Sequence, residues 1–375
     1  MIYLDYSANT PADSRVLERF CEVERSCPGN ANSRHQAGRD AKLVIDHATQ
    51  SIAGLLSAQP AEVIYTSGAS EANNFALKGL AKLSRHLGKH IISTPLEHSS
   101  VSGTLTALQE QGYEIDLVDI RRDGTIDLEH LKELLRPDTI AVAVTLVDSE
   151  LGVVQPVKEI SEILQAWPNC HHLHVDATQA VGKIPASFEG VDTMSLTAHK
   201  FYGLNGIGLL LKRRRLALEP LIHGGESTTI YRSGTPTVAL AASLETALNS
   251  AVNELPERSA RVKEANLYLR TALSKYPKVR INSPESAIPH ILNLSVENVK
   301  GTVFQRELDA EGVCVSVKSA CSSDGLPSRA VFAVSRDRKN ALSSWRISLS
   351  HLTTQEELDG FLRAFDACYT RLTQL

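Results

Sequence analysis

Apolar and polar residues form two different patterns in the first half of the chain. Between residues 36 and 56, apolar side chains recur every three or four positions, which predicts one long amphipathic helix. Short apolar runs typical of buried strands then occur at 62–65, 90–93, 115–118, 140–146, 172–175 and 193–196. Because helix-length amphipathic stretches separate most of these runs, the pattern predicts an α/β fold with a mainly parallel sheet.

The pattern changes in the last third of the chain. Helices are predicted at 238–252 and 258–273, strands at 278–281 and 288–294, and further helices at 302–311 and 355–372. The first two helices are separated by a break near Pro256. This mixed order indicates a second, smaller domain.

Composition and charge exclude several classes of function. The net charge of −4 and the pI near 6.4 argue against nucleic acid as a direct partner, and we interpret the basic run at 212–215 as a solvated strand end. No apolar run approaches a membrane span and residues 1–5 lack a signal-peptide pattern, so we expect no membrane contact and a cytoplasmic protein. The six cysteines lack C-x-x-C spacing, so neither a metal site nor a disulfide framework is expected.

Candidate chemistry centres on Lys200, which follows an apolar run and precedes a Gly-rich hairpin signal at 203–208. That is a suitable place for a lysine that forms a Schiff base. Asp176 ends an earlier apolar run and offers a carboxylate for the protonated ring nitrogen of pyridoxal phosphate (PLP). The segment 66–72 follows a strand-like run and opens a helical pattern, which is typical of an anion cradle.

Two downstream residues complete this candidate constellation. Cys321 lies among small residues and has few apolar neighbours, so a core position is disfavoured. Arg346 lies between Trp345 and Ile347 in an apolar context. Burial of an unpaired guanidinium is costly, and either a carboxylate ligand or a structural acid relieves that cost.

Several sequence blocks, taken together in this order, resemble the NifS/IscS-like cysteine desulfurases of the class V aminotransferase group. The blocks are 4–11, 66–73, 97–98, 150–156, 175–182, 198–203, 232–235, 319–322 and 346–348. The resemblance covers nearly the full chain. It implies a PLP-dependent transferase of fold type I, with a seven-stranded, mainly parallel sheet in a large domain of residues 13–255. Residues 1–12 and 256–375 would form a small α+β domain that carries the cysteine loop.

The resemblance also implies roles for residues around the cofactor PLP. Lys200 would hold PLP covalently and move the α-proton of the substrate, His98 would stack on the ring, and Asp176 would keep the ring nitrogen protonated. Gln179 would contact the ring hydroxyl, as would the side chain at position 149. The phosphate would be bound by Ala69, Ser70, Thr197, His199 and, from the second subunit of a homodimer, Thr235.

The implied reaction is the removal of sulfur from L-cysteine. Arg346 would bind the substrate carboxylate, with Asn30 nearby, and Cys321 would attack the substrate sulfur to leave L-alanine and an enzyme persulfide. Such a sulfurtransferase would pass the sulfur to an acceptor protein in iron–sulfur cluster assembly or a thiolation pathway. A selenocysteine lyase or cysteine sulfinate-type β-eliminase, which need not depend on Cys321, is an alternative, as is a PLP-binding scaffold with little turnover. An aminotransferase is disfavoured because transamination requires no mobile thiol.

Three positions depart from the family pattern. Ser149 stands where asparagine is usual, Glu226 interrupts a loop that normally lines the site, and Lys318 replaces a small residue three positions before Cys321. The shorter Ser149 side chain weakens the expected contact to the ring hydroxyl. The Lys318 ammonium would lower the pKa of the thiol if it points toward it.

Overall fold

The computed structural model describes residues 1–167, 172–318 and 326–374. The helices are α1 (Ser14–Ser26), α2 (Gln36–Leu55), α3 (Ala69–Ser84), α4 (Ser99–Gln109), α5 (Leu128–Leu134), α6 (Val157–Ala166), α7 (Val238–Asn253), α8 (Leu255–Leu273), α9 (Gly301–Ala310), α10 (Arg329–Ser335), α11 (Arg338–Ser343) and α12 (Gln355–Thr373), with the 3-10 turns η1 (Pro60–Glu62) and η2 (Ala198–Lys200). The strands are β1 (Ile2–Tyr3), β2 (Val63–Thr66), β3 (His90–Ser93), β4 (Glu114–Leu117), β5 (Thr139–Thr145), β6 (His172–Asp176), β7 (Thr193–Thr197), β8 (Gly208–Lys212), β9 (Val279–Ile281), β10 (Ile291–Val296), β11 (Val313–Cys314) and β12 (Ser344–Ser348). Within these residues, no helix is both long and apolar enough to span a lipid bilayer.

The main sheet has seven strands in the order β2-β8-β7-β6-β5-β3-β4. The strands β7, β6, β5, β3 and β4 run parallel, whereas β8 pairs antiparallel with both β2 and β7. β8 is reversed because the Gly-rich connection at 203–208 is too short for a crossover helix and returns the chain along β7. The predicted α/β class with a mainly parallel seven-stranded sheet is confirmed.

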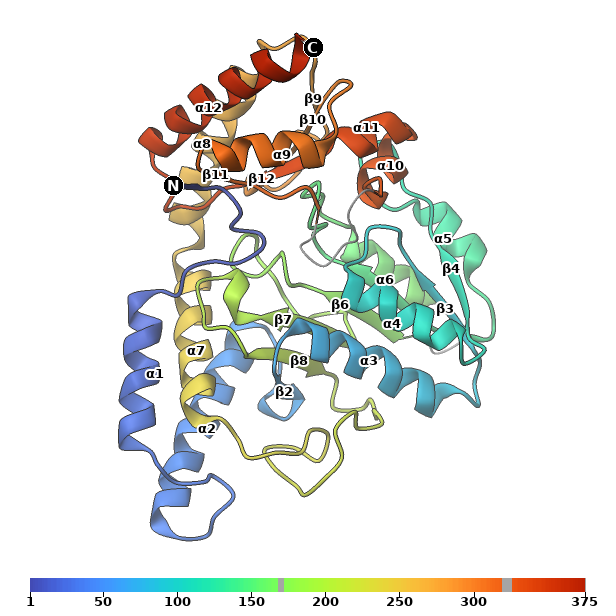
Figure 1. Cartoon of the computed structure of the whole chain (residues 1–375). Helices are drawn as coiled ribbons and strands as arrows, with labels where there is room; N and C mark the ends of the chain where they lie inside the picture. Colours follow the sequence, from blue (N-terminus) through green and yellow to red (C-terminus); the bar gives the residue numbers. More distant parts are fainter. Residues whose placement is uncertain (168–171, 319–325, 375) are drawn as a thin grey trace.

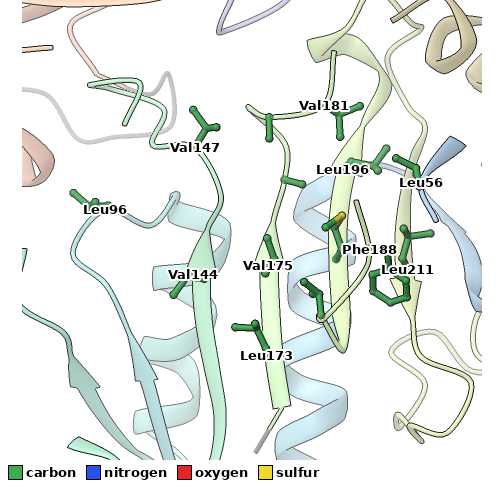
Figure 2. Packing of buried hydrophobic residues seen from close by; sticks show 14 of the residues in the cluster. Leu56, Leu96, Val144, Val147, Leu173, Val175, Val181, Phe188, Leu196 and Leu211 are labelled. Carbon is green, nitrogen blue, oxygen red and sulfur yellow. The ribbon is translucent and has the colours of Figure 1, made fainter. Parts of the chain in front are cut away.

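Apolar side chains of the sheet strands form the largest core of the molecule. Figure 2 shows Val144, Leu173, Val175, Leu196 and Leu211 in this cluster, and each is at most 1 % exposed. Full burial of a side chain of this size contributes about 2–3 kcal/mol. The central strands are therefore held firmly, and so are the polar residues at which they end.

The helix predicted at 36–56 is confirmed as α2, which packs against α7 at one side of the sheet (Figure 1). Its apolar face, with Ala41, Ile45, Ala48 and Ile52, is buried. The three- and four-residue spacing in the sequence thus corresponds to one buried stripe on the helix.

A second core forms after α7. An antiparallel sheet of order β12-β10-β9 shares it with α8, α9 and α12, which lie together at the top of Figure 1. At its centre Trp345 stacks on Phe304, with ring centroids 5.1 Å apart. β1 pairs in parallel with β11, so the first residues of the chain pack with its last third. The division into residues 13–255 and residues 1–12 with 256–375 stays a prediction.

The structure differs from two sequence predictions for reasons of tertiary contact. The strand expected at 288–294 begins only at Ile291, because the Ile288 N–H donates to the Gly152 carbonyl instead of a strand neighbour. The interpretation of 212–215 as a solvated strand end is wrong for its first residue, since Lys212 is 1 % exposed. Its ammonium donates to the Leu216 carbonyl and lies 4.3 Å from the Tyr231 ring centroid, and these contacts replace water.

A buried carboxyl group organises the turn that follows β5. Asp148 is fully buried, and its Oδ2 accepts hydrogen bonds from the N–H groups of Glu150 and Leu151. Its Oδ1 has no partner among the described residues. Burial, followed by the nearby Glu150 carboxyl, raises the pKa of Asp148 to about 7.

We expect Asp148→Asn to stabilise the apo protein at pH 8 and to have little effect at pH 4.5. The unfolded carboxyl ionises near its ordinary pKa of 3.8, whereas the folded one keeps its proton to about 7. The wild type therefore loses stability as the pH rises from about 4 to about 7, and the amide, which cannot ionise, does not. Urea unfolding at both pH values should give a difference of about 4 kcal/mol at pH 8.

The exposed Asp40→Asn on α2 is the matched control and should change the unfolding free energy by less than about 0.5 kcal/mol at either pH. An effect of Asp148→Asn that is equal at pH 4.5 and pH 8 would contradict the assignment of a protonated buried carboxyl.

Candidate active site

A cavity of about 330 Å³ opens beyond the carboxyl ends of the central strands. β6 ends at Asp176 and β7 ends at Thr197, with Lys200 in η2 directly after it. This edge is where open α/β sheets bind ligands. The sequence-predicted residues that line the cavity are Ala69, Ser70, His98, Ser149, Asp176, Gln179, Thr197, His199, Lys200 and Arg346.

The amino group of Lys200 lies against the N-terminal segment of the chain. Its Nζ donates to the main-chain carbonyls of Ser7 at 2.8 Å and Ala8 at 2.5 Å. The same segment is tied to η2 by Thr10, whose hydroxyl donates to the His199 carbonyl at 2.9 Å. Ser7 and Ala8 therefore form part of the cavity wall and hold the Lys200 side chain in the site.

Asp176 is fixed by a buried polar network behind the cavity. Its Oδ2 accepts a hydrogen bond from Asn73 Nδ2 at 2.8 Å, and its Oδ1 accepts from the Thr178 N–H at 2.9 Å. Asn73 is fully buried, and its Oδ1 pairs with His174 Nε2 at 3.0 Å and accepts from the Ser195 hydroxyl. Burial lowers the pKa of His174 to about 4, so the ring is neutral and the carboxylate is the charge that this network orients.

His98 is held in one neutral form by the start of α4. Its ring is the N-cap: Nδ1 accepts the Ser100 N–H at 3.1 Å and lies 2.9 Å from the Ser100 hydroxyl. A nitrogen that accepts carries no proton, so the neutral ring has its hydrogen on Nε2. Burial lowers the pKa of His98, and the charge of Lys200 acts in the same direction.

Glu97 anchors the loop that carries His98. Its Oε1 accepts hydrogen bonds from the Thr94 hydroxyl and from the Thr145 N–H at the end of β5, both at 2.8 Å. Burial raises the pKa of Glu97 to about 8, so at neutral pH this carboxyl group is mostly protonated.

An anion-binding corner lies at the N-terminus of α3. Gly68, with φ of 155°, precedes the helix and provides no side-chain cap, so the first N–H groups of α3 have no partner within the helix. Thr197 Oγ1 lies 3.1 Å from His199 Nδ1 beside this turn. Burial, with the charges of Lys200 and Lys183, lowers the pKa of His199 to about 4, so this ring is neutral at physiological pH.

Arg346 enters the cavity from β12 and is almost fully buried. Its Nη2 donates to Asp5 Oδ1 at 2.9 Å and its Nη1 donates to the Ser149 carbonyl at 2.6 Å. Its Nε has no partner among the described residues. The structural acid considered from the sequence is thus present as Asp5. The two contacts engage two of the five N–H donors of the guanidinium, which leaves N–H groups for a ligand.

The donors and acceptors of the cavity fit PLP. The hydroxyls of Ser7 and Thr178 line it, are buried, and have no partner within the described ranges. A helix N-terminus for the phosphate, a fixed carboxylate for the ring nitrogen and an amine for the aldehyde lie on the same cavity. Among the described residues, no cluster of three His, Cys, Asp or Glu side chains could hold a metal ion.

Two predicted residues do not line this cavity, and a third lies outside the described residues. Thr235 is exposed and borders a separate hollow beside Tyr65, and Asn30 is exposed in the loop before α2. Cys321 lies outside the described residues, in the gap 319–325. For these three the structure does not test the predicted roles.

Sequence reasoning missed several residues that complete the site. Asp5, Ser7 and Ala8 belong to the block 4–11, which carried the resemblance but received no role. Asn73 closes the block 66–73, and its polar side chain on a buried helix face was the available signal. Lys183 directly follows the block 175–182, so its position in the sequence could have drawn attention to it.

Comparison with known proteins agrees with this geometry. The family described as Aminotransferase class-V matches residues 2–361. The "Cysteine desulfurase IscS" of Proteus mirabilis is 39 % identical, and the match covers 100 % of this chain and 94 % of that protein.

Two solved structures share the fold along nearly the whole chain. One described as a NifS-like protein is 33 % identical, with a TM-score of 0.92 and full coverage of both chains. A structure described as SspA in complex with cysteine is 29 % identical, with a TM-score of 0.83, and covers 94 % of this chain and 100 % of that one. The fold predicted from the sequence, that of the fold type I PLP enzymes, is confirmed. The chain belongs to the class V aminotransferase family, within the group of NifS- and IscS-like cysteine desulfurases.

Proposed function

We propose that this chain is a cysteine desulfurase that binds PLP, takes sulfur from L-cysteine, releases L-alanine and carries the sulfur as a persulfide on Cys321. The observation that carries the proposal is the convergence of Lys200, Asp176 and Arg346 on one cavity. The related cysteine desulfurases and the neighbouring SspA structure with cysteine support L-cysteine as the substrate.

The cofactor would be held at four points. Lys200 would bind it covalently, Asp176 would pair with its ring nitrogen, and Gln179 and Ser149 would contact its ring hydroxyl. Its phosphate would lie at the α3 N-terminus, bound by Ala69, Ser70, Thr197 and His199. When bound, PLP supplies an electron sink for the electrons released at the α-carbon of the substrate.

The chain's own residues would position the substrate and move its protons. Arg346 would bind the α-carboxylate through N–H groups of its guanidinium that Asp5 and Ser149 do not engage. The Nζ of Lys200 would accept the α-proton and later return a proton to carbon. The His98 imidazole, held neutral with its hydrogen on Nε2, would stack on the pyridine ring of PLP without adding a charge.

The sulfur step needs no external oxidant or reductant. The Cys321 thiolate would attack the substrate sulfur, so that a sulfur–sulfur bond forms while the carbon–sulfur bond breaks. The carbon keeps the electron pair of the broken bond and is protonated to give L-alanine. An acceptor protein of cluster assembly or thiolation would then take the outer sulfur from the persulfide.

A second copy of the chain would complete the site. Thr235 is exposed and does not border the cavity of its own chain, and nearby Ile230 is 67 % exposed. Both features support a homodimer in which Thr235 reaches the phosphate of the other copy. A cytoplasmic location without membrane or direct nucleic-acid contact is part of the same proposal.

We expect the PLP-loaded wild type to convert L-cysteine, in the presence of a reductant, to equal amounts of L-alanine and sulfide. Lys200→Ala should lose the visible absorption of bound PLP and at least about 10³-fold of the activity, because both cofactor binding and proton transfer depend on its amine. Cys321→Ala should keep the absorption and lose the sulfide. Quantified alanine and sulfide, with absorption spectra, check this.

A wild type that binds PLP but leaves L-cysteine unchanged would favour the scaffold alternative. Full activity of Cys321→Ala would favour a lyase that does not depend on the persulfide. Either result would contradict the proposed reaction.

For Arg346→Lys we expect the KM for L-cysteine to rise about tenfold or more, with a smaller change in kcat. A lysine ammonium cannot hold Asp5, the Ser149 carbonyl and a carboxylate in one plane, as a guanidinium does. Steady-state kinetics over a range of L-cysteine concentrations measures both constants. Arg280→Lys, at an exposed arginine outside the cavity, is the control and should leave KM and kcat unchanged. If Arg346→Lys changes kcat but not KM, Arg346 does not bind the substrate carboxylate.

A further inference from the structure

Lys183 is a buried lysine close to the cavity that the proposed reaction does not use. It is 7 % exposed, and the described part of the chain gives it no ion pair with a carboxylate. Within the described ranges, the groups that interact with its charge are Lys200, Arg346, His199 and His290, and none of these four is acidic. Burying an ammonium in such surroundings is unfavourable, so its position is unlike that of a residue placed for stability.

The contacts of Lys183 lead directly to the cofactor cavity. Its Nζ donates to Gln179 Oε1, and Gln179 Nε2 donates to the Ser7 carbonyl at 2.9 Å. The same carbonyl accepts the hydrogen bond from Lys200 Nζ at 2.8 Å. Lys183, Gln179, Ser7 and Lys200 thus form one continuous chain of hydrogen bonds.

These hydrogen bonds fix the orientation of the Gln179 side-chain amide. A lysine amine with its protons can only donate to the amide, so Oε1 must face Lys183. Nε2 is then directed toward Ser7 on the cavity side. A glutamine held in this way presents an N–H donor, not an acceptor, to the ring hydroxyl oxygen of PLP.

Lys183 also places a second ionisable amine at the other end of this hydrogen-bond chain from Lys200. Burial lowers the pKa of Lys183 well below its ordinary value, and the charge of Lys200 lowers it further. Repulsion between two such groups is mutual, so Lys183 also disfavours the protonated form at Lys200. A neighbouring cation is one established way to keep a reactive lysine neutral.

We propose that Lys183 is a positioning residue of the PLP site, which holds the Gln179 amide with its N–H toward the cofactor and keeps a second ionisable amine near Lys200. The inference rests on the proposed function, since it requires PLP in the cavity. Lys183 acts through Gln179 and Lys200, and it does not line the cavity itself.

The test compares PLP binding and the pH titration of the visible absorption of bound PLP in Lys183→Met and in the wild type. We expect Lys183→Met to weaken PLP binding about tenfold, because the Gln179 amide loses its fixed orientation. The titration midpoint should rise by about half a unit or more, because removal of a neighbouring cation makes the protonated form at Lys200 less costly. Lys183→Gln, which keeps a polar side chain but no charge, should raise the midpoint in the same direction.

A matched control separates this role from the general effect of removing a buried lysine. Lys212 is equally buried, but its ammonium donates to carbonyls away from the cavity, so Lys212→Met should leave PLP binding and the midpoint unchanged. Equal effects of Lys183→Met and Lys212→Met on these two quantities would overturn the inference.

A double-mutant cycle tests the route through Gln179. If Lys183 acts on PLP affinity by orienting Gln179, then Lys183→Met should add nothing to the loss already caused by Gln179→Met. If the losses of PLP affinity from the two substitutions multiply in the double variant, Lys183 does not act through Gln179. If the wild type takes up no PLP, the proposed function is refuted together with the inference. If the wild type is active and Lys183→Met has the same PLP affinity and titration midpoint, the inference alone is refuted.

Discussion

The carboxyl edge of the parallel sheet is the constraint on which the site depends. β6 and β7 are adjacent and in register, with Asp176 opposite Ser195, so the residues that end both strands meet at one place. Buried apolar side chains pack against β6 and β7, and the cavity lies beyond the ends of these two strands. A carboxylate at the end of β6 and a lysine just after β7 are thereby brought to the same cavity.

A second constraint comes from the N-terminal segment. β1 pairs with β11, which ties the start of the chain to the last third of it, and the following residues cross the cavity. There the Ser7 carbonyl receives both Gln179 and Lys200, and Asp5 pairs with Arg346. The site therefore forms only when both ends of the chain are in place, and its assembly is coupled to the folding of the second core.

Charged side chains of both signs lie around the cavity. Lys200 and Arg346 line it together with Asp176 and Glu71, and Glu71 pairs with Arg232 while Asp5 pairs with Arg346. Lys200 and Arg346 suit a phosphate-bearing cofactor and an α-carboxylate, which are anions, and the neutral His98 and His199 add no further charge.

The local part of this arrangement followed from sequence alone. Strand-like runs that end in Asp176 or shortly before Lys200, and a small-residue turn at the start of α3, are encoded by neighbouring residues. Contacts between distant segments were decided only by the tertiary structure. Asp5 and Arg346 are 341 positions apart, and nothing near either residue indicates the other. Lys183 received no interpretation from the sequence. Only the packing buries it and links it through Gln179 and Ser7 to Lys200, because burial and neighbouring charges depend on how the elements pack and not on local sequence.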